Sequence, residues 1–305
     1  MDTKVAVVTG SNKGVGFAIV RALCRQFDGD VYLTESSKTS KHICCKGMTA
    51  ITFDKTSPQI DVGRGYLDLI ALETRAEGRP PANNGEGKVC TRNDHESVVR
   101  LRDFLKKTYG GLDILVNNAG IVFNDDSIPF VEQVAATTRT NFFSTLEACQ
   151  VLFPILRPHS RVVNLSSMSS QMGLARCSEA LRARFTDSNL TMDELRALVN
   201  KFVETAKVNK HLEAGFCGSS YFLSKIGVTV MSMIQQREID SQGANDIVVN
   251  ACCPGYVATD LTNHQGSLTI DEGAATPVYC ALLPPNINSP RGKFIREKKI
   301  ADWKM

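Results

Sequence analysis

The stretch that decides the fold is Lys4-Val5-Ala6-Val7-Val8-Thr9-Gly10-Ser11-Asn12-Lys13-Gly14-Val15-Gly16, near the start of a 305-residue chain. It begins with an apolar, β-branched run without polar alternation, which is typical of a strand buried on both faces of a parallel sheet. Three glycines follow, and residues 17–24 then show the apolar spacing of a helix. This order favours a dinucleotide site, because glycines let a helix N-terminus approach a pyrophosphate. The spacing differs from the common dinucleotide fingerprint, and the alternative is a tight strand–helix turn without a ligand.

Apolar strands alternate with helical patterns along much of the remaining chain. We expect strands at residues 29–34, 111–116, 160–165, 247–253 and 293–295. We expect helices from Asp94 as an N-cap, from residue 140, from residue 272, and around Tyr221. Residues 174–215 read as added helices with a capping box at 191–194. The pattern predicts a single α/β domain, residues 1–305, with a doubly wound, Rossmann-like parallel sheet and a helical insert before the Tyr221 helix.

Tyr221 and Lys225 lie four residues apart in the stretch Gly218-Ser219-Ser220-Tyr221-Phe222-Leu223-Ser224-Lys225. On a helix both side chains leave the same face, one turn apart. A free tyrosine has a pKa of about 10 and is a poor acid at neutral pH. A nearby ammonium favours the phenolate and lowers that pKa, so the pair is a candidate proton donor with its tuning group. The alternative is a packed tyrosine beside a solvated lysine.

Composition narrows the class of protein. Hydrophobic residues make up 43% and charged residues 22%, and the formal charge of +3 is too small to argue for nucleic acid or an anionic membrane. The ten cysteines have no regular spacing, and we read no metal site because neither Cys44-Cys45 nor Cys252-Cys253 has a second ligand pair. No signal peptide or long apolar span is evident. We therefore expect a cytoplasmic protein with free thiols.

Polar and small residues follow several predicted strands, where ligands sit in open α/β sheets. Asn117-Asn118-Ala119-Gly120 follows one strand, Ser166-Ser167 ends another, and Pro254-Gly255 follows Cys252-Cys253. Asn141 lies among apolar residues and is either a satisfied core amide or a functional one. Cys252 and Cys253 are either two buried small residues or place a thiol near a substrate.

Taken together, these motifs resemble the short-chain dehydrogenase/reductase family, and specifically its monomeric, cytosolic, NADPH-dependent carbonyl reductases. The resemblance implies that NADPH reduces a ketone, aldehyde or quinone while Tyr221 supplies the proton. It also implies that Lys225 lowers the pKa of Tyr221 and holds the nicotinamide ribose, and that Ser167, rather than Ser166, donates to the substrate carbonyl. Asn141 would hold a water that links Lys225 to solvent. Ser167 and Tyr221 would thus contact the substrate.

The resemblance further implies which residues hold the cofactor and why the chain is a monomer. The interval between Ser167 and Tyr221 is longer than in most family members. Its insert is similar to one that covers the surface through which other members form tetramers. The implied cofactor contacts are Gly10, Asn12, Lys13, Gly14, Val15, Gly16, Asn117, Ala119, Gly120, Tyr221, Lys225, Pro254, Gly255 and Val257.

Two features depart from the expected subfamily. Glu35 and Ser36 replace an Ala-Arg pair whose arginine would meet the 2′-phosphate of NADPH. Glu35 could instead accept from a free ribose hydroxyl and favour NAD, whereas Lys13 favours NADP. Residues 36–92 are atypical: they contain a turn-rich part that we expect to be mobile, and only residues 66–70 read as a strand.

These departures leave two alternatives to an NADPH-dependent carbonyl reductase. The first is an inactive, splice-variant-like homologue that keeps the catalytic residues but cannot hold the cofactor. The second is an NAD-dependent alcohol dehydrogenase, which rests on Glu35 alone. The physiological substrate is not evident from the sequence.

Overall fold

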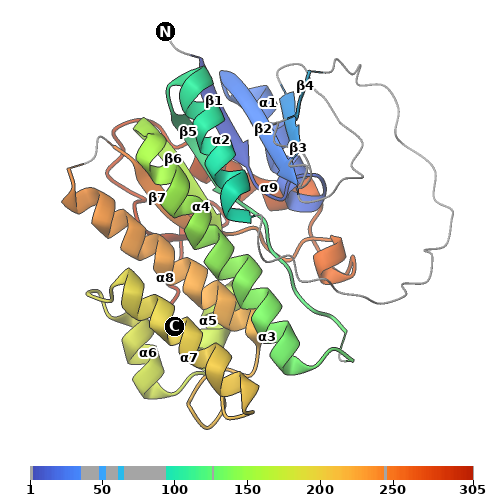
Figure 1. Cartoon of the computed structure of the whole chain (residues 1–305), viewed down its shortest axis with the longest axis vertical. Coiled ribbons are helices and arrows are strands. Elements are labelled where there is room, and N and C mark those ends of the chain that lie inside the picture. The colour runs from blue at the N-terminus through green and yellow to red at the C-terminus, as the bar shows by residue number, and fades with distance from the viewer. Residues whose placement is uncertain are drawn as a thin grey trace, which may run out of the picture.

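A nine-stranded sheet forms the centre of the described part of the protein (Figure 1). The structure is a computed structural model, and it describes residues 3–35, 48–52, 61–64, 94–125, 127–243 and 246–304. Its strand order is β4-β3-β2-β1-β5-β6-β7-β8-β9. The seven strands from β3 to β8 in this order pair in parallel, and β4 and β9 add antiparallel edges. The bounds are Lys4–Val8 (β1), Gly29–Glu35 (β2), Met48–Thr52 (β3), Asp61–Arg64 (β4), Leu112–Asn117 (β5), Leu156–Leu165 (β6), Val248–Cys253 (β7), Phe294–Arg296 (β8) and Lys299–Ile300 (β9). The predicted doubly wound α/β fold is confirmed.

Helices cover both faces of the sheet, which explains why the strands are apolar without alternation. Val5 and Val7 of β1 pack on one side with residues of α2 (Asp94–Tyr109), α4 (Ser144–Leu152) and α8 (Ser220–Ser241). Ala6 and Val8 pack on the other side with α1 (Gly14–Gln26) and α9 (Ile270–Ala281). All four of these β1 side chains are fully buried. None of the helices in the described ranges is long and apolar enough to cross a membrane.

Two strands lie inside the segment 36–92 that sequence analysis could not interpret. β3 pairs in parallel with β2, from Val31 opposite Met48 to Glu35 opposite Thr52. β4 then returns antiparallel to β3. The parallel sheet therefore continues beyond β2, through residues whose pattern did not identify them as a strand. The strand predicted at 66–70 lies outside the described residues.

The helix predicted to open at residue 140 begins ten residues earlier. α3 (Phe130–Thr138) continues through a π-helical turn, η1 (Arg139–Phe143), into α4 and then a short 3₁₀ turn, η2 (Phe153–Ile155). Sequence analysis missed α3, because the polar residues around Thr140 and Asn141 resemble a helix start. The π turn inserts a residue into the helix, and such turns occur often at functional sites.

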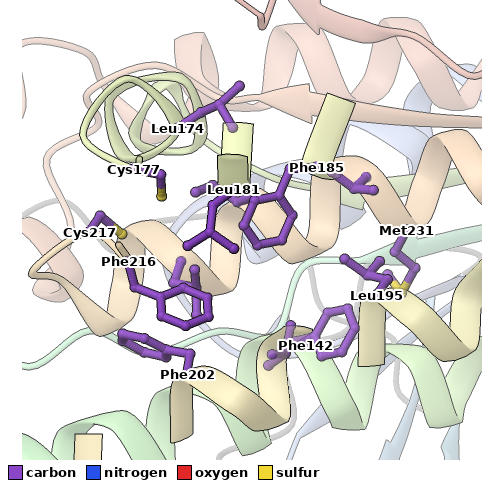
Figure 2. Packing of buried hydrophobic residues seen from close by; sticks show 14 of the residues in the cluster. Phe142, Leu174, Cys177, Leu181, Phe185, Leu195, Phe202, Phe216, Cys217 and Met231 are labelled. Carbon is purple, nitrogen blue, oxygen red and sulfur yellow. The ribbon is translucent and has the colours of Figure 1, made fainter. Parts of the chain in front are cut away.

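The helical insert is confirmed as α6 (Glu179–Thr186) and α7 (Met192–Lys207), which follow α5 (Met168–Ala175). Thr191 and Glu194 form the predicted capping box at the start of α7. The helices α6 and α7 pack on α8, and α7 also contacts α3 (Figure 1). Figure 2 shows the shared core, in which Phe202 of α7 lies beside Phe216.

Phe202 is the residue on which we expect the insert to depend most. Its side chain is fully buried, so Phe202→Ala should lower the free energy of unfolding by about 3–5 kcal/mol. Val208 ends the same helix but is 63% exposed, and Val208→Ala should change stability by less than about 0.5 kcal/mol. Urea unfolding followed by circular dichroism measures both. Equal effects of the two substitutions would contradict this view of the insert core.

Candidate active site

The carboxyl ends of four adjacent parallel strands bring the predicted site residues to one edge of the sheet. The glycine loop follows β1, residues 117–120 follow β5, Ser166 and Ser167 follow β6, and Pro254 follows β7. The parallel register pairs β1 with β5, β5 with β6, and β6 with β7. This edge is where open α/β sheets bind ligands.

The glycine loop is held close to the end of β5 by Asn118. The Asn118 side-chain amide donates to the carbonyl oxygens of Thr9 (2.9 Å) and Gly10 (2.8 Å). A Cβ on Gly16 would lie only 2.3 Å from that amide nitrogen, so no larger residue fits there. Gly10 and Gly14 have φ of +59° and +58°, a conformation that glycine adopts without strain.

These features form a cradle that suits a dinucleotide pyrophosphate. Lys13 is the N-cap of α1 but makes no side-chain capping bond, so the first turn of α1 lacks a side-chain acceptor there. A helix N-terminus of this kind binds anions through its backbone N–H groups. Asn12 and Lys13 are exposed, and Val15 lies against Gly273 of α9. The cradle therefore fits the cofactor that the sequence pattern predicts.

Sequence analysis did not assign Asn118 a role and gave a cofactor contact to its neighbour Asn117. The Asn117 side chain is buried inside the protein, where its amide donates to Asn164 Oδ1 at 2.8 Å and to Cys149 Sγ at 3.3 Å. A contact between Asn117 and a cofactor stays a prediction, as do those of exposed Ala119 and half-buried Gly120. The sequence signal that could have identified Asn118 is the pair of amides at the end of one predicted parallel strand, because that end can lie beside the glycine loop that ends another.

Lys13 is paired with an acidic residue. Its ammonium lies 2.5 Å from Asp260 Oδ2, in the turn η3 (Asp260–Thr262). Both side chains are more than half exposed, and exposed ion pairs contribute about 1 kcal/mol or less. A phosphate could therefore compete for the ammonium at little cost. The backbone of Glu35 ends β2, but its side chain and Ser36 lie outside the described residues, so the predicted conflict over the ribose stays untested.

Tyr221 and Lys225 lie one turn apart at the start of α8, as predicted. Ser219 caps this helix by accepting from the Phe222 N–H at 3.3 Å. The Lys225 ammonium is buried, donates to the carbonyl of Leu165 at 2.7 Å, and lies 5.6 Å from the centroid of the Tyr221 ring. The end of β6 thus fixes the lysine, and the helix fixes the tyrosine next to it.

The two adjacent serines after β6 have different surroundings. The Ser166 hydroxyl is buried and lies 2.6 Å from Thr229 Oγ1 and 3.1 Å from the Lys225 carbonyl. Ser167 caps α5 and forms a hydrogen bond with Tyr221. Of the two, Ser167 is the one that interacts with the Tyr221 side chain, and its predicted contact with a substrate stays a prediction.

Burial controls the ionisation of the pair. Desolvation raises the pKa of Tyr221 to about 12, although the hydrogen bond from Ser167 lowers it. Desolvation also lowers the pKa of Lys225 to about 8. The expectation that Lys225 lowers the pKa of Tyr221 is not met by this geometry, because removal of the phenolate from water has the largest effect on that pKa and raises it. The proton on Tyr221 is therefore retained throughout the neutral range.

Asn141 is a satisfied core amide. It lies in the π turn, accepts from the Ile121 N–H (2.8 Å), and donates to the Ile121 carbonyl (2.9 Å) and to Ser224 Oγ (3.0 Å). A Cβ on Gly120 would lie 3.3 Å from Asn141 Oδ1 and 3.7 Å from Lys225 Nζ, which places the three residues together. Asn141 thus ties the segment after β5 to α8, while its predicted role in holding a water stays a prediction.

The segment after β7 is shaped by Gly255, which has φ of +92° and whose N–H lies 3.4 Å from Cys253 Sγ. Cys252 and Cys253 are both buried, and the sulfur of Cys253 is near enough to Tyr221 to raise its pKa. Val257 is buried, so its side chain packs internally. Pro254 borders the same edge as Tyr221, and the cofactor contacts of Pro254, Gly255 and Val257 stay predictions. The described residues contain no group of three potential metal ligands.

Comparison with known proteins agrees with this arrangement. The profile of the short chain dehydrogenase family matches residues 82–179. Carbonyl reductase (NADPH) 3 of Rattus norvegicus is 43% identical over 303 residues, which cover 99% of each chain, and carbonyl reductase (NADPH) 1 of Homo sapiens is 44% identical over 301 residues, which cover 98% of each. The structure of salutaridine reductase from Papaver somniferum shares the fold, with a TM-score of 0.71 and 23% identity over 95% of this chain and 99% of that one. This chain belongs to the short-chain dehydrogenase/reductase family.

Proposed function

We propose that this protein reduces ketones, aldehydes or quinones to alcohols or hydroquinones with NADPH. The observation that carries the proposal is the cluster of Ser167, Tyr221 and Lys225 at the sheet edge that also holds the glycine cradle. The relatives that match almost the whole chain are named NADPH-dependent carbonyl reductases. Neither the inactive homologue nor the NAD-dependent dehydrogenase has comparable support.

Each residue of the cluster has a chemical role in this reaction. Bound NADPH supplies the hydride. Tyr221, protonated at neutral pH, donates its phenolic proton to the oxygen of the carbonyl. Ser167 donates a hydrogen bond to the same oxygen and stabilises the negative charge that develops there. Lys225 supplies a buried ammonium near the Tyr221 ring, with donor capacity beyond its bond to Leu165.

We further propose a monomeric, cytoplasmic protein. The insert helices α6 and α7 pack on α8. The family resemblance implies that such an insert covers the surface through which other members form tetramers. The seven cysteines within the described ranges are free thiols, as in a reducing compartment. Size-exclusion chromatography with light scattering would give the mass of a monomer, and a tetramer would contradict the role of the insert.

Removing the Tyr221 hydroxyl should stop the chemistry without unfolding the protein. Tyr221→Phe should lower kcat for an aromatic quinone by about 10²–10⁴-fold, because the proton donor is lost. Tyr279→Phe removes a hydroxyl from a half-buried tyrosine of α9 and should leave kcat unchanged. Steady-state kinetics of both variants, with NADPH binding checked by fluorescence, makes the comparison. Wild-type activity in Tyr221→Phe would overturn the assignment.

Lys225 should set the alkaline limit of the reaction. Its pKa of about 8 means that the ammonium loses its proton as the pH rises through 8, so kcat/KM should fall above that pH. Tyr221 contributes no such decline below its own higher pKa. In Lys225→Arg the guanidinium stays charged, and the residual activity should show no decline between pH 7 and 10. A flat wild-type profile, or the same decline in the arginine variant, would assign the effect to another group.

Lys13 should decide between the two nicotinamide cofactors. We expect NADPH to bind more tightly than NADH, and Lys13→Ala to weaken NADPH binding about tenfold while NADH binding stays constant, because only NADPH carries the 2′-phosphate. Lys4→Ala removes an exposed ammonium from the opposite end of β1 and serves as the control. Fluorescence titration of the wild-type protein and the two variants with each cofactor gives the six dissociation constants. Tighter binding of NADH by the wild-type protein would contradict the proposed cofactor.

A further inference from the structure

Two buried cysteines that have no part in the proposed reaction are in contact within the insert. Cys177 lies between α5 and α6, and Cys217 lies in the α7–α8 loop, residues 208–219. Their side chains are 5% and 1% exposed. The two thiols are in contact, and Figure 2 shows their sulfur atoms on the facing sides of the two segments. The Cys217 thiol also lies 3.6 Å from the carbonyl oxygen of Ser219, to which it donates.

The backbones on which these cysteines sit are already held together. The Ser178 N–H donates to the carbonyl of Gly215 at 2.8 Å. A Cβ on Gly215 would lie 2.4 Å from Ser178 Oγ, so the two segments pack without a gap. A disulfide needs Cα atoms within about 7 Å and side chains that face one another. The contact between the thiols and the adjacent backbone bond are consistent with that requirement.

Access distinguishes this pair from another pair of thiols in contact. Cys252 and Cys280 are also in contact, but they lie between β7 and α9 with 0% and 1% exposure and with buried chain neighbours on β7. In contrast, the chain neighbours Arg176, Ser178 and Gly218 are exposed, so both cysteines of the Cys177–Cys217 pair lie next to surface residues. We therefore expect a small oxidant to reach this pair more readily than the Cys252–Cys280 pair.

We propose that Cys177 and Cys217 form a reversible disulfide on reaction with a hydroperoxide, and that this bond restrains the α7–α8 loop. In the first step the Cys177 thiolate attacks the peroxide: an S–O bond forms, the O–O bond breaks, and the leaving oxygen takes a proton. In the second step the Cys217 thiol attacks the resulting sulfenic sulfur: the S–S bond forms, the S–O bond breaks, and water leaves with the Cys217 proton. The pair loses two electrons and the peroxide gains them.

The two thiols differ in the way that this order of steps requires. The contact with the Cys217 side chain lowers the pKa of Cys177 in spite of burial, and the Arg182 guanidinium lowers it further. The same contact, together with burial, raises the pKa of Cys217. The thiolate is the form that attacks a peroxide, so Cys177 is the first nucleophile and Cys217 resolves the intermediate.

The disulfide would act on the catalytic helix through a short piece of chain. Cys217 precedes the helix cap Ser219 by two residues and Tyr221 by four. Bonded sulfurs lie about 2.0 Å apart, closer than any hydrogen-bonded thiols, so bond formation pulls the loop towards α6. A displacement of even ~1 Å at reacting groups costs up to about 100-fold in rate. We expect the oxidised protein to show kcat about tenfold below the reduced one.

Peptide mapping tests the bond without reference to activity. The full-length protein is treated with hydrogen peroxide, unfolded, alkylated without reductant and digested with trypsin. We expect peptides 177–182 and 211–225, which hold one cysteine each, to appear as a disulfide-linked species that dithiothreitol separates. The buried Cys149 thiol should stay reduced during oxidation, so the peptide that holds it should be recovered in the alkylated form and serves as the internal control. Absence of the linked species, while the oxidant reacts with other thiols, overturns the proposal.

Steady-state kinetics then test whether the disulfide restrains the α7–α8 loop, and this test rests on the proposed function. Peroxide should lower kcat of the wild-type protein about tenfold, and dithiothreitol should restore it. Cys177→Ser and Cys217→Ser should keep the activity of the reduced protein and lose the response. A linked species with unchanged kcat overturns the restraint but not the bond. If no variant or condition shows reductase activity, the proposed function fails, and the mapping still decides on the disulfide.

Discussion

The parallel pairing of β1, β5, β6 and β7 is the constraint on which the rest of the structure depends. Because neighbouring strands point the same way, each delivers the residue after its last hydrogen bond to the same edge. β1 delivers the glycine loop, β5 delivers Asn118, β6 delivers Ser167, and β7 delivers Pro254. The lysine of α8 is then anchored on the β6 carbonyl of Leu165, which couples the catalytic helix to the sheet. Each part of the site therefore depends on the pairing of these four strands.

Much of this arrangement was predictable, because it depends on local signals. A strand covered on both faces must be apolar throughout, and β1 and β5 to β7 were recognised by that property. The α7 capping box and the one-turn spacing of Tyr221 and Lys225 are equally local, since they follow from helix geometry alone. The family resemblance rested on the order of these signals and correctly indicated the fold.

What the sequence did not show depends on contacts between distant segments. Asn118 acts through carbonyls more than 100 positions away, so its partner can be identified only after β1 and β5 are known to be neighbours in the sheet. Asn117 and Asn118 look alike in sequence, yet the pleat sends one side chain into the core and the other to the glycine loop. The raised pKa of Tyr221 is a property of burial, which spacing alone does not report. β3 was missed because its five residues mix polar and apolar side chains, and they form a strand only by pairing with β2.

The dispersed origin of the site has a consequence for how the protein becomes competent. Its contributing segments begin at residue 9 and end beyond residue 254, and each parallel pair is closed only by a crossover of many residues. Topologies of this kind fold slowly, because long loops must be ordered before their contacts form. During synthesis, a chain whose β7 segment has not yet emerged from the ribosome therefore has neither a complete sheet nor a complete set of site residues at the sheet edge. Appearance of activity during synthesis would report the completion of the whole domain rather than of any one part.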